Sequence, residues 1–89
     1  MASAVERAIF KLLAARDESK TICPSEAARS VDSEGWRKLM PQVRTTAIGL
    51  AREGRLVITR HGKPADPDAF KGVYRLRLPN VGGQAGDGS

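Results

Sequence analysis

The chain has 89 residues, of which 40% are apolar and 28% are charged, and its net charge is +5. A chain of this length can bury one modest core but not two, and this composition excludes wholesale disorder. The single cysteine, Cys23, excludes an internal disulfide and a multi-thiolate zinc site. No run approaches the roughly 18 apolar residues of a membrane span, and the N-terminus lacks a signal-peptide pattern, so we expect a cytoplasmic protein.

The positive charge is concentrated in one half of the chain. Residues 1–34 carry five cations and six anions, whereas residues 35–79 carry ten cations and three anions. This excess predicts a polyanionic partner that meets the second half of the chain. The alternative is a basic surface that only keeps a small protein soluble.

The first two helices are marked by their N-terminal residues. Ser3 followed by Glu6 is a capping-box pattern, and the apolar residues after it recur at helical spacing, which predicts a helix over residues 4–15. Pro24 suits the first turn of a second helix, because the N–H that proline lacks has no helical partner there. This short helix should end near Val31.

The third helix is expected to begin at a proline. We place Pro41 in its first turn, after a short turn over residues 36–40, because proline inside a helix removes a hydrogen bond. Ser33 or Glu34 would help to cap whatever starts directly after the loop that contains them. Gly54 should end the helix as a left-handed C-cap.

After the third helix the apolar period changes to two. Residues 56–60 and 73–78 alternate as strands of a hairpin, and an extended piece at Ile22 would supply a third strand. The connection over residues 61–72 is longer than a usual hairpin loop, which predicts a protruding loop and not a tight turn. The glycine-rich residues 80–89 are predicted to be a disordered tail.

This order of elements predicts an α+β winged helix over residues 1–79. It is a helix-turn-helix with a C-terminal β-hairpin wing, built from three helices and a small antiparallel sheet. The first helix, one side of the third helix and one side of the hairpin should close a single core. In such folds the second helix of the helix-turn-helix pair enters the major groove of DNA.

Several stretches of the sequence resemble a known family. They are "TICPSEAARSV", "WR" followed by "LMPQVR", "EGRLVIT", and "DP" and "G" before "YRLRL". Together they resemble the Domain of Unknown Function 3253 family of small, mostly bacterial proteins, over residues 21–78. The resemblance implies a winged-helix fold, and it carries no activity or binding residue over to this chain.

The predicted fold gives the basic half of the chain a DNA-binding surface. In the first turns of the third helix, arginine can bind guanine and glutamine can bind adenine through paired hydrogen bonds, and threonine offers a hydroxyl and a methyl group. Cations on the wing suit phosphates. The expected nucleic-acid contacts are Arg37, Lys38, Gln42, Arg44, Thr45, Thr46, Arg52, Arg60, Lys63, Arg75 and Arg77. The alternative is that these residues are only a solvated face.

Three single residues have expected roles of another kind. Trp36 should pack over the helix junction, because so large a ring buries much area in a small domain. Cys23 should be a small buried hydrophobe, and His61 should be an ordinary surface residue of the loop.

An enzyme has little support in this sequence. The histidine and the cysteine are far apart, and no nucleophile motif, metal-ligand spacing or glycine-rich phosphate loop is present. We therefore expect no catalytic residue, metal or cofactor, and a module that binds double-stranded DNA in a transcription-related role. The rival is a winged helix that serves as a protein-interaction or assembly module without nucleic acid. Whether the chain forms a homodimer is left open.

Overall fold

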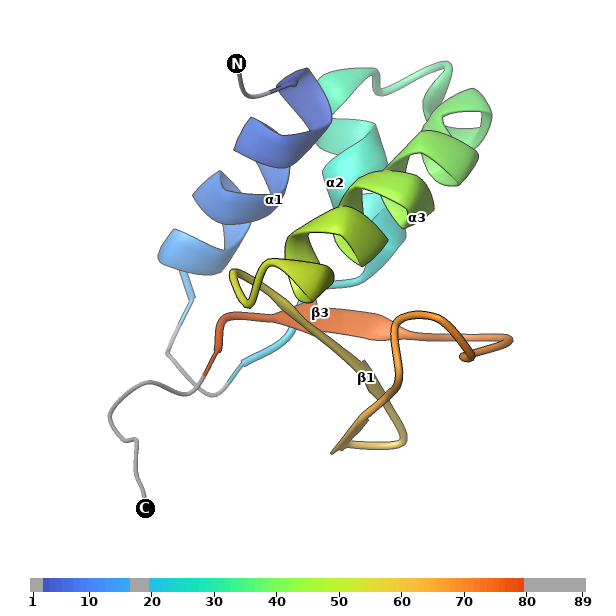
Figure 1. The fold of residues 1–89 in the computed structure, drawn as a ribbon. Coiled ribbons are helices and arrows are strands. Elements are labelled where there is room, and N and C mark those ends of the chain that lie inside the picture. The colour runs from blue at the N-terminus through green and yellow to red at the C-terminus, as the bar shows by residue number, and fades with distance from the viewer. Residues whose placement is uncertain (1–2, 17–19, 80–89) are drawn as a thin grey trace.

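The computed structural model of the chain describes residues 3–16 and 20–79 (Figure 1). These residues form three helices and a three-stranded antiparallel sheet in the order β2-β1-β3. The elements are α1 (Ala4–Ala14), α2 (Pro24–Val31), α3 (Trp36–Arg52), β1 (Val57–Arg60), β2 (Lys63–Pro64) and β3 (Arg75–Arg77). This α+β arrangement is consistent with the predicted winged-helix-like fold. The predicted tail over residues 80–89 lies outside the described residues.

The first two helices begin where their sequences predict. The Ser3 Oγ accepts the Glu6 N–H at 3.1 Å, which satisfies one of the free donors at the start of α1. In α2 the Glu26 carboxylate reaches back and accepts the Cys23 N–H at 2.7 Å. Pro24 occupies the first turn of α2, where its missing N–H costs nothing.

The three helices lie on one side of the sheet, and the core fills the space between them (Figure 1). Each element contributes its apolar side, so that one cluster unites the whole domain. The buried residues of this cluster are Val5, Ile9, Leu13, Ile22, Ala27, Ala28, Val43, Ala47, Leu50, Leu56, Ile58, Phe70, Tyr74 and Leu76.

The piece of chain between α1 and α2 joins the sheet at one point. Ile22 donates to the Leu76 carbonyl at 2.8 Å and accepts the Leu76 N–H at 3.0 Å. The predicted third-strand contact is therefore confirmed as a single antiparallel bridge. Leu76 pairs with Ile58 of β1 on its other side, so β3 is hydrogen-bonded along both edges at this residue.

The start of α3 differs from the prediction. The helix begins at Trp36, and Pro41 lies inside it and not in its first turn. The turn before α3 is organised by Asp32, not by the predicted caps Ser33 or Glu34. The Asp32 Oδ1 accepts the Glu34 N–H at 3.1 Å and the N–H of Gly35, the N-cap residue, at 2.9 Å.

This arrangement explains why α3 tolerates its proline. Pro41 removes the helical hydrogen bond to the Arg37 carbonyl, four residues earlier. Both residues are on the exposed side of the helix, where water can satisfy that carbonyl. The loss is therefore smaller than in a buried helix, and the prediction that a turn over residues 36–40 precedes the helix is wrong.

The wing also differs from the prediction, because it contains a tight turn. Arg60 pairs with Lys63, and the two residues between them, His61 and Gly62, have φ values of 53° and 80°. Two central residues with positive φ form a type I′ turn, which matches the right-handed twist of a hairpin. The long loop expected over residues 61–72 is thus a short hairpin followed by a segment that folds back onto the core.

In the described part of the chain, no helix combines the length and the apolar character that crossing a membrane requires.

Candidate nucleic-acid interface

One side of α3 is fully exposed along the length of the helix. It repeats at intervals of four and three residues, which places its members on one face opposite the buried Val43, Ala47 and Leu50. We call this face the α3 stripe, and it consists of Lys38, Gln42, Thr45, Gly49 and Arg52. The stripe carries two cations and two hydrogen-bonding side chains, and it contains neither a carboxylate nor a large apolar group.

Gly49 lies in the middle of the stripe, and nothing inside the domain requires a glycine there. A Cβ added at Gly49 would meet no atom within 4 Å. Glycine inside a helix costs about 0.5–1 kcal/mol of stability relative to alanine. The helix backbone is therefore open to close approach at this position, at a cost to the stability of the domain.

Two arginines of α3 attach the segment after the hairpin to the helix. The Arg44 Nη2 donates to the Phe70 carbonyl at 3.0 Å, and its guanidinium lies 4.1 Å from the centre of the Phe70 ring. The Arg52 Nε donates to the Asp68 Oδ1 at 2.9 Å, with a second contact through Nη2. Residues 65–72 therefore lie beside α3, and we call them the wing loop.

The predicted contact residues of α3 have unequal freedom. Gln42 and Thr45 are exposed, and Thr46 is half-buried. Arg44 is also half-buried and is engaged with Phe70, so its guanidinium is used within the domain. Arg52 shares its charge with Asp68, but the two side chains are 62% and 57% exposed, and an ion pair this exposed is weak.

The cations of the wing are also divided. Lys63 is exposed on the short strand β2. The Arg60 Nε donates to the Val73 carbonyl at 3.0 Å. A Cβ on Gly72 would lie 3.1 Å from the Arg60 Nη2, so the glycine lets this guanidinium lie close to the backbone.

Arg75 and Arg77 point away from the helical layer. They flank Leu76 in β3, and Leu76 faces the core with 0% of its surface exposed. Since side chains alternate along a strand, the two arginines project from the outer face of the sheet. The Arg75 Nε donates to the Thr21 Oγ1 at 2.6 Å, and the Arg77 Nη1 donates to the Leu78 carbonyl at 3.2 Å. The α3 stripe and this pair are thus two separate basic surfaces.

The remaining predicted cations lie at the start of α3, around Trp36. The guanidinium carbons of Arg29 and Arg37 lie 4.4 and 4.5 Å from the centre of the Trp36 ring. Trp36 is half-buried and packs against the core cluster, as expected for a residue at the helix junction. Lys38 is exposed and lies near enough to Asp32 to influence its charge.

The turn between α2 and α3 is sensitive to acid. The N–H groups of Gly35 and Glu34 bond the Asp32 carboxylate and lower its pKa, against the opposing effect of burial, and Lys38 lowers it further. A Cβ on Gly35 would come within 2.6 Å of the Asp32 Oδ2, so only glycine lets the carboxylate close this turn without a shift.

We expect the amide signals of Glu34 and Gly35 to titrate together, with a midpoint below the ordinary aspartate pKa of about 3.9. Because the folded-state pKa is lowered, this contribution to stability is complete above the ordinary value and is lost as pH falls through the lowered one. NMR spectra from about pH 6 to pH 2 measure the midpoint. In the control Asp32→Asn, whose amide oxygen accepts the same bonds without titrating, the two signals should stay constant.

The comparisons with known proteins follow from this point. The sequence profile of a family described as "Protein of unknown function (DUF3253)" matches residues 2–79. The chain belongs to the DUF3253 family. The resemblance found in the sequence is confirmed, and a comparison with curated proteins finds no match. For this DUF3253 domain, a function must therefore be argued from the geometry of its surface.

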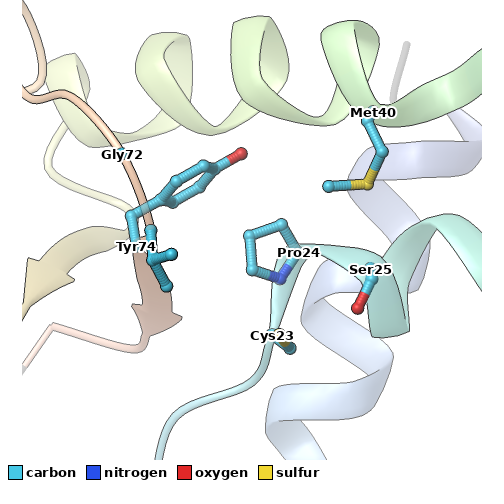
Figure 2. A pocket seen from close by; sticks show the side chains of 7 residues that line it. Cys23, Pro24, Ser25, Met40, Gly72 and Tyr74 are labelled. Atoms are coloured by element: carbon cyan, nitrogen blue, oxygen red, sulfur yellow. The ribbon is translucent and has the colours of Figure 1, made fainter. Parts of the chain in front are cut away.

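Sequence reasoning missed one feature of the DUF3253 domain, a pocket beside α3. Its volume is about 350 Å³, and Figure 2 shows Met40 of α3 and the ring of Tyr74 on either side of Pro24. The lining residues are Cys23, Pro24, Ser25, Met40, Gly72, Val73 and Tyr74. They come from three segments that are far apart in the chain, so no local pattern could have indicated the pocket.

The lone cysteine and the loop histidine are not brought together with other metal-binding side chains. Cys23 is half-buried at the start of α2, and His61 is exposed at the hairpin turn. Within residues 3–16 and 20–79, no group of three or more His, Cys, Asp or Glu side chains could hold a metal ion.

Proposed function

We propose that this domain binds double-stranded DNA, with the α3 stripe in the major groove and the wing loop beside the phosphate backbone. The observation that carries the proposal is the composition of the stripe. An exposed helix face with cations at both ends, hydrogen-bonding groups in the middle and no carboxylate complements a polyanion better than it complements an apolar or basic partner.

The dimensions of α3 support this mode of binding. A helix of 17 residues is about 25 Å long, and the major groove, about 12 Å wide, admits one helix. Gln42 and Thr45 lie between Lys38 and Arg52 along the stripe. The two neutral side chains would therefore meet base edges, and the two cations would meet phosphates at either side of the groove.

The wing supplies further phosphate contacts in this proposal. Lys63 on β2 and Lys71 in the wing loop are exposed and lie on the part of the chain that Arg52 and Arg44 hold beside α3. A phosphate can replace Asp68 as the partner of Arg52, because that ion pair is exposed and weak. We leave Arg75 and Arg77 out of this contact, since they project from the outer face of the sheet.

A titration with random-sequence duplex DNA at several salt concentrations tests the proposal. Four phosphate contacts, from Lys38, Arg52, Lys63 and Lys71, predict that the logarithm of the binding constant falls with the logarithm of salt concentration with a slope of about −4. Fluorescence anisotropy of a labelled duplex measures this slope. Absent or salt-insensitive binding would contradict the proposal.

Gly49→Ala should separate folding from binding. Alanine should raise the free energy of unfolding by about 0.5–1 kcal/mol, because it favours the helix and clashes with nothing. The same methyl group should weaken duplex binding severalfold, because it stands where the groove approaches the helix backbone. Urea unfolding and the anisotropy titration measure the two effects.

The matched control is Ser30→Ala on the exposed side of α2, which also removes a poor helix former. Its duplex affinity should equal that of the parent chain. If Gly49→Ala binds DNA as tightly as this control, the duplex does not approach α3 at Gly49.

A further inference from the structure

The pocket between α2, α3 and the segment before β3 has the size of a small-molecule site. Its volume of about 350 Å³ lies at the lower end of the range of roughly 300–1,000 Å³ typical of ligand pockets. Met40, Pro24 and Val73 give it apolar walls. Val73 is 81% exposed, so this wall is open to solvent on one side. A compact apolar group could therefore enter without a change in the fold.

Tyr74 gives this apolar pocket one polar group. The Tyr74 side chain is buried, with 8% of its surface exposed, and its ring packs against Phe70 with the centroids 4.9 Å apart. Figure 2 shows its hydroxyl directed over Pro24 toward Met40, into the pocket. No described residue forms a hydrogen bond with this hydroxyl. A buried hydroxyl without a partner is costly, and a polar atom of a ligand would satisfy it.

Two guanidinium groups determine which polar atom fits best. Arg44 lies 5.9 Å from the centre of the Tyr74 ring, and Arg60 bonds the carbonyl of Val73 in the pocket wall. The nearest carboxylate on α2, that of Glu26, is already paired with Arg16. The surroundings of the Tyr74 hydroxyl are therefore positive, which favours an anion.

The protonation of Tyr74 agrees with this role. Burial raises the pKa of the Tyr74 hydroxyl, and this outweighs the lowering effect of Arg44. At neutral pH the hydroxyl therefore keeps its proton and can donate it to an oxygen acceptor.

From these observations we propose that the pocket binds a small apolar carboxylate. The apolar body lies against Met40, Pro24 and Val73, and the carboxylate accepts a hydrogen bond from the Tyr74 hydroxyl in the field of Arg44 and Arg60. A hydrogen bond to a charged acceptor is stronger than one to a neutral acceptor, so the charge of the ligand contributes to affinity. The site is independent of DNA binding, because no residue of the α3 stripe lines it.

The first test compares two probes of the same shape, 3-phenylpropionate and the neutral 3-phenylpropanol, on the full chain without DNA. In amide NMR titrations, 3-phenylpropionate should saturate one site, with the largest shifts at residues 23–25 and 72–74. It should bind about tenfold more tightly than the alcohol, as expected for one charge-assisted hydrogen bond. Shifts that do not saturate, or equal affinities for the two probes, would overturn the proposal.

Two variants locate the contact. Tyr74→Phe keeps the ring against Phe70 and removes the hydroxyl, and it should weaken 3-phenylpropionate binding about tenfold while leaving the alcohol less affected. Val73→Asp places a carboxylate on the exposed wall, where it does not disturb folding. It should also weaken binding of the anion about tenfold or more and leave the alcohol within about twofold.

The matched control is Val31→Asp, which adds the same charge at an exposed valine at the far end of α2. It should bind 3-phenylpropionate about as the parent chain does. If Val73→Asp and Val31→Asp bind the anion equally well, the ligand does not occupy this pocket, whatever the outcome of the DNA titration.

Discussion

Duplex DNA should bind the double variant Lys38→Gln/Arg52→Gln about tenfold or more weakly than the parent chain at about 0.1 M salt. The two cations lie at opposite ends of the α3 stripe, so each would meet a different stretch of the phosphate backbone. Removing two phosphate contacts should also reduce the steepness of the salt dependence by about 2. Anisotropy titrations at several salt concentrations measure both quantities.

The matched control for this experiment is Arg75→Gln/Arg77→Gln, which removes the same charge from the outer face of the sheet. Its affinity should fall less than about threefold, through the change in net charge alone. If the sheet pair weakens binding more than the α3 pair does, the duplex meets the outer face of the sheet, and the proposed orientation is wrong. Glutamine keeps the length and polarity of the side chains in both pairs, so folding should be unaffected.

Leu76→Ala should lower the free energy of unfolding by about 2–5 kcal/mol, a large share of the total of about 5–15 kcal/mol for a domain. Leu76 is completely buried, and its backbone joins Ile22 to β1 through hydrogen bonds on both edges of β3. A cavity at this residue therefore loosens the contact of the sheet with the helices above it. Urea unfolding followed by far-UV circular dichroism measures the loss.

Val73→Ala is the control for Leu76→Ala, because it removes apolar atoms three residues earlier from a side chain that is 81% exposed. Its free energy of unfolding should stay within about 0.5 kcal/mol of that of the parent chain. Equal losses in the two variants would contradict the central position of Leu76 in the core.

The elements that the sequence predicts well are those specified by neighbouring residues. Ser3 and Glu6 mark the start of α1, and Pro24 marks the start of α2. The change of apolar period after Gly54 locates the sheet. In each case the physical cause lies within a few positions in the chain, as a cap, a missing N–H or an alternation of side chains.

The elements that the sequence predicts poorly depend on a competition between local preference and the rest of the fold. Pro41 by itself favours a helix start, but Asp32 organises the backbone before Trp36, and the helix continues through the proline. The His61–Gly62 turn lacks the common Asn-Gly or Asp-Gly pair, although the glycine was a usable signal.

The candidate site shows the same limit. The exposed positions Lys38, Gln42 and Thr45 follow from the helical period, and the sequence predicts them correctly as displayed. The engagement of Arg44 with Phe70 could not be predicted, because the two residues are 26 positions apart and Phe70 lies in a loop with no apolar pattern. Contacts of this kind are set by the path of the wing loop across α3.

The placement of Trp36 between two arginines has a consequence for how folding can be observed. It is the only tryptophan of the chain, so its fluorescence reports on a single place, the junction of α2 and α3. Stacked guanidinium groups and the half-buried ring fix the polarity around the indole. The emission therefore follows this junction, whereas circular dichroism follows all three helices. A difference between the two unfolding curves would separate local opening of the helix-turn-helix from cooperative loss of the whole domain.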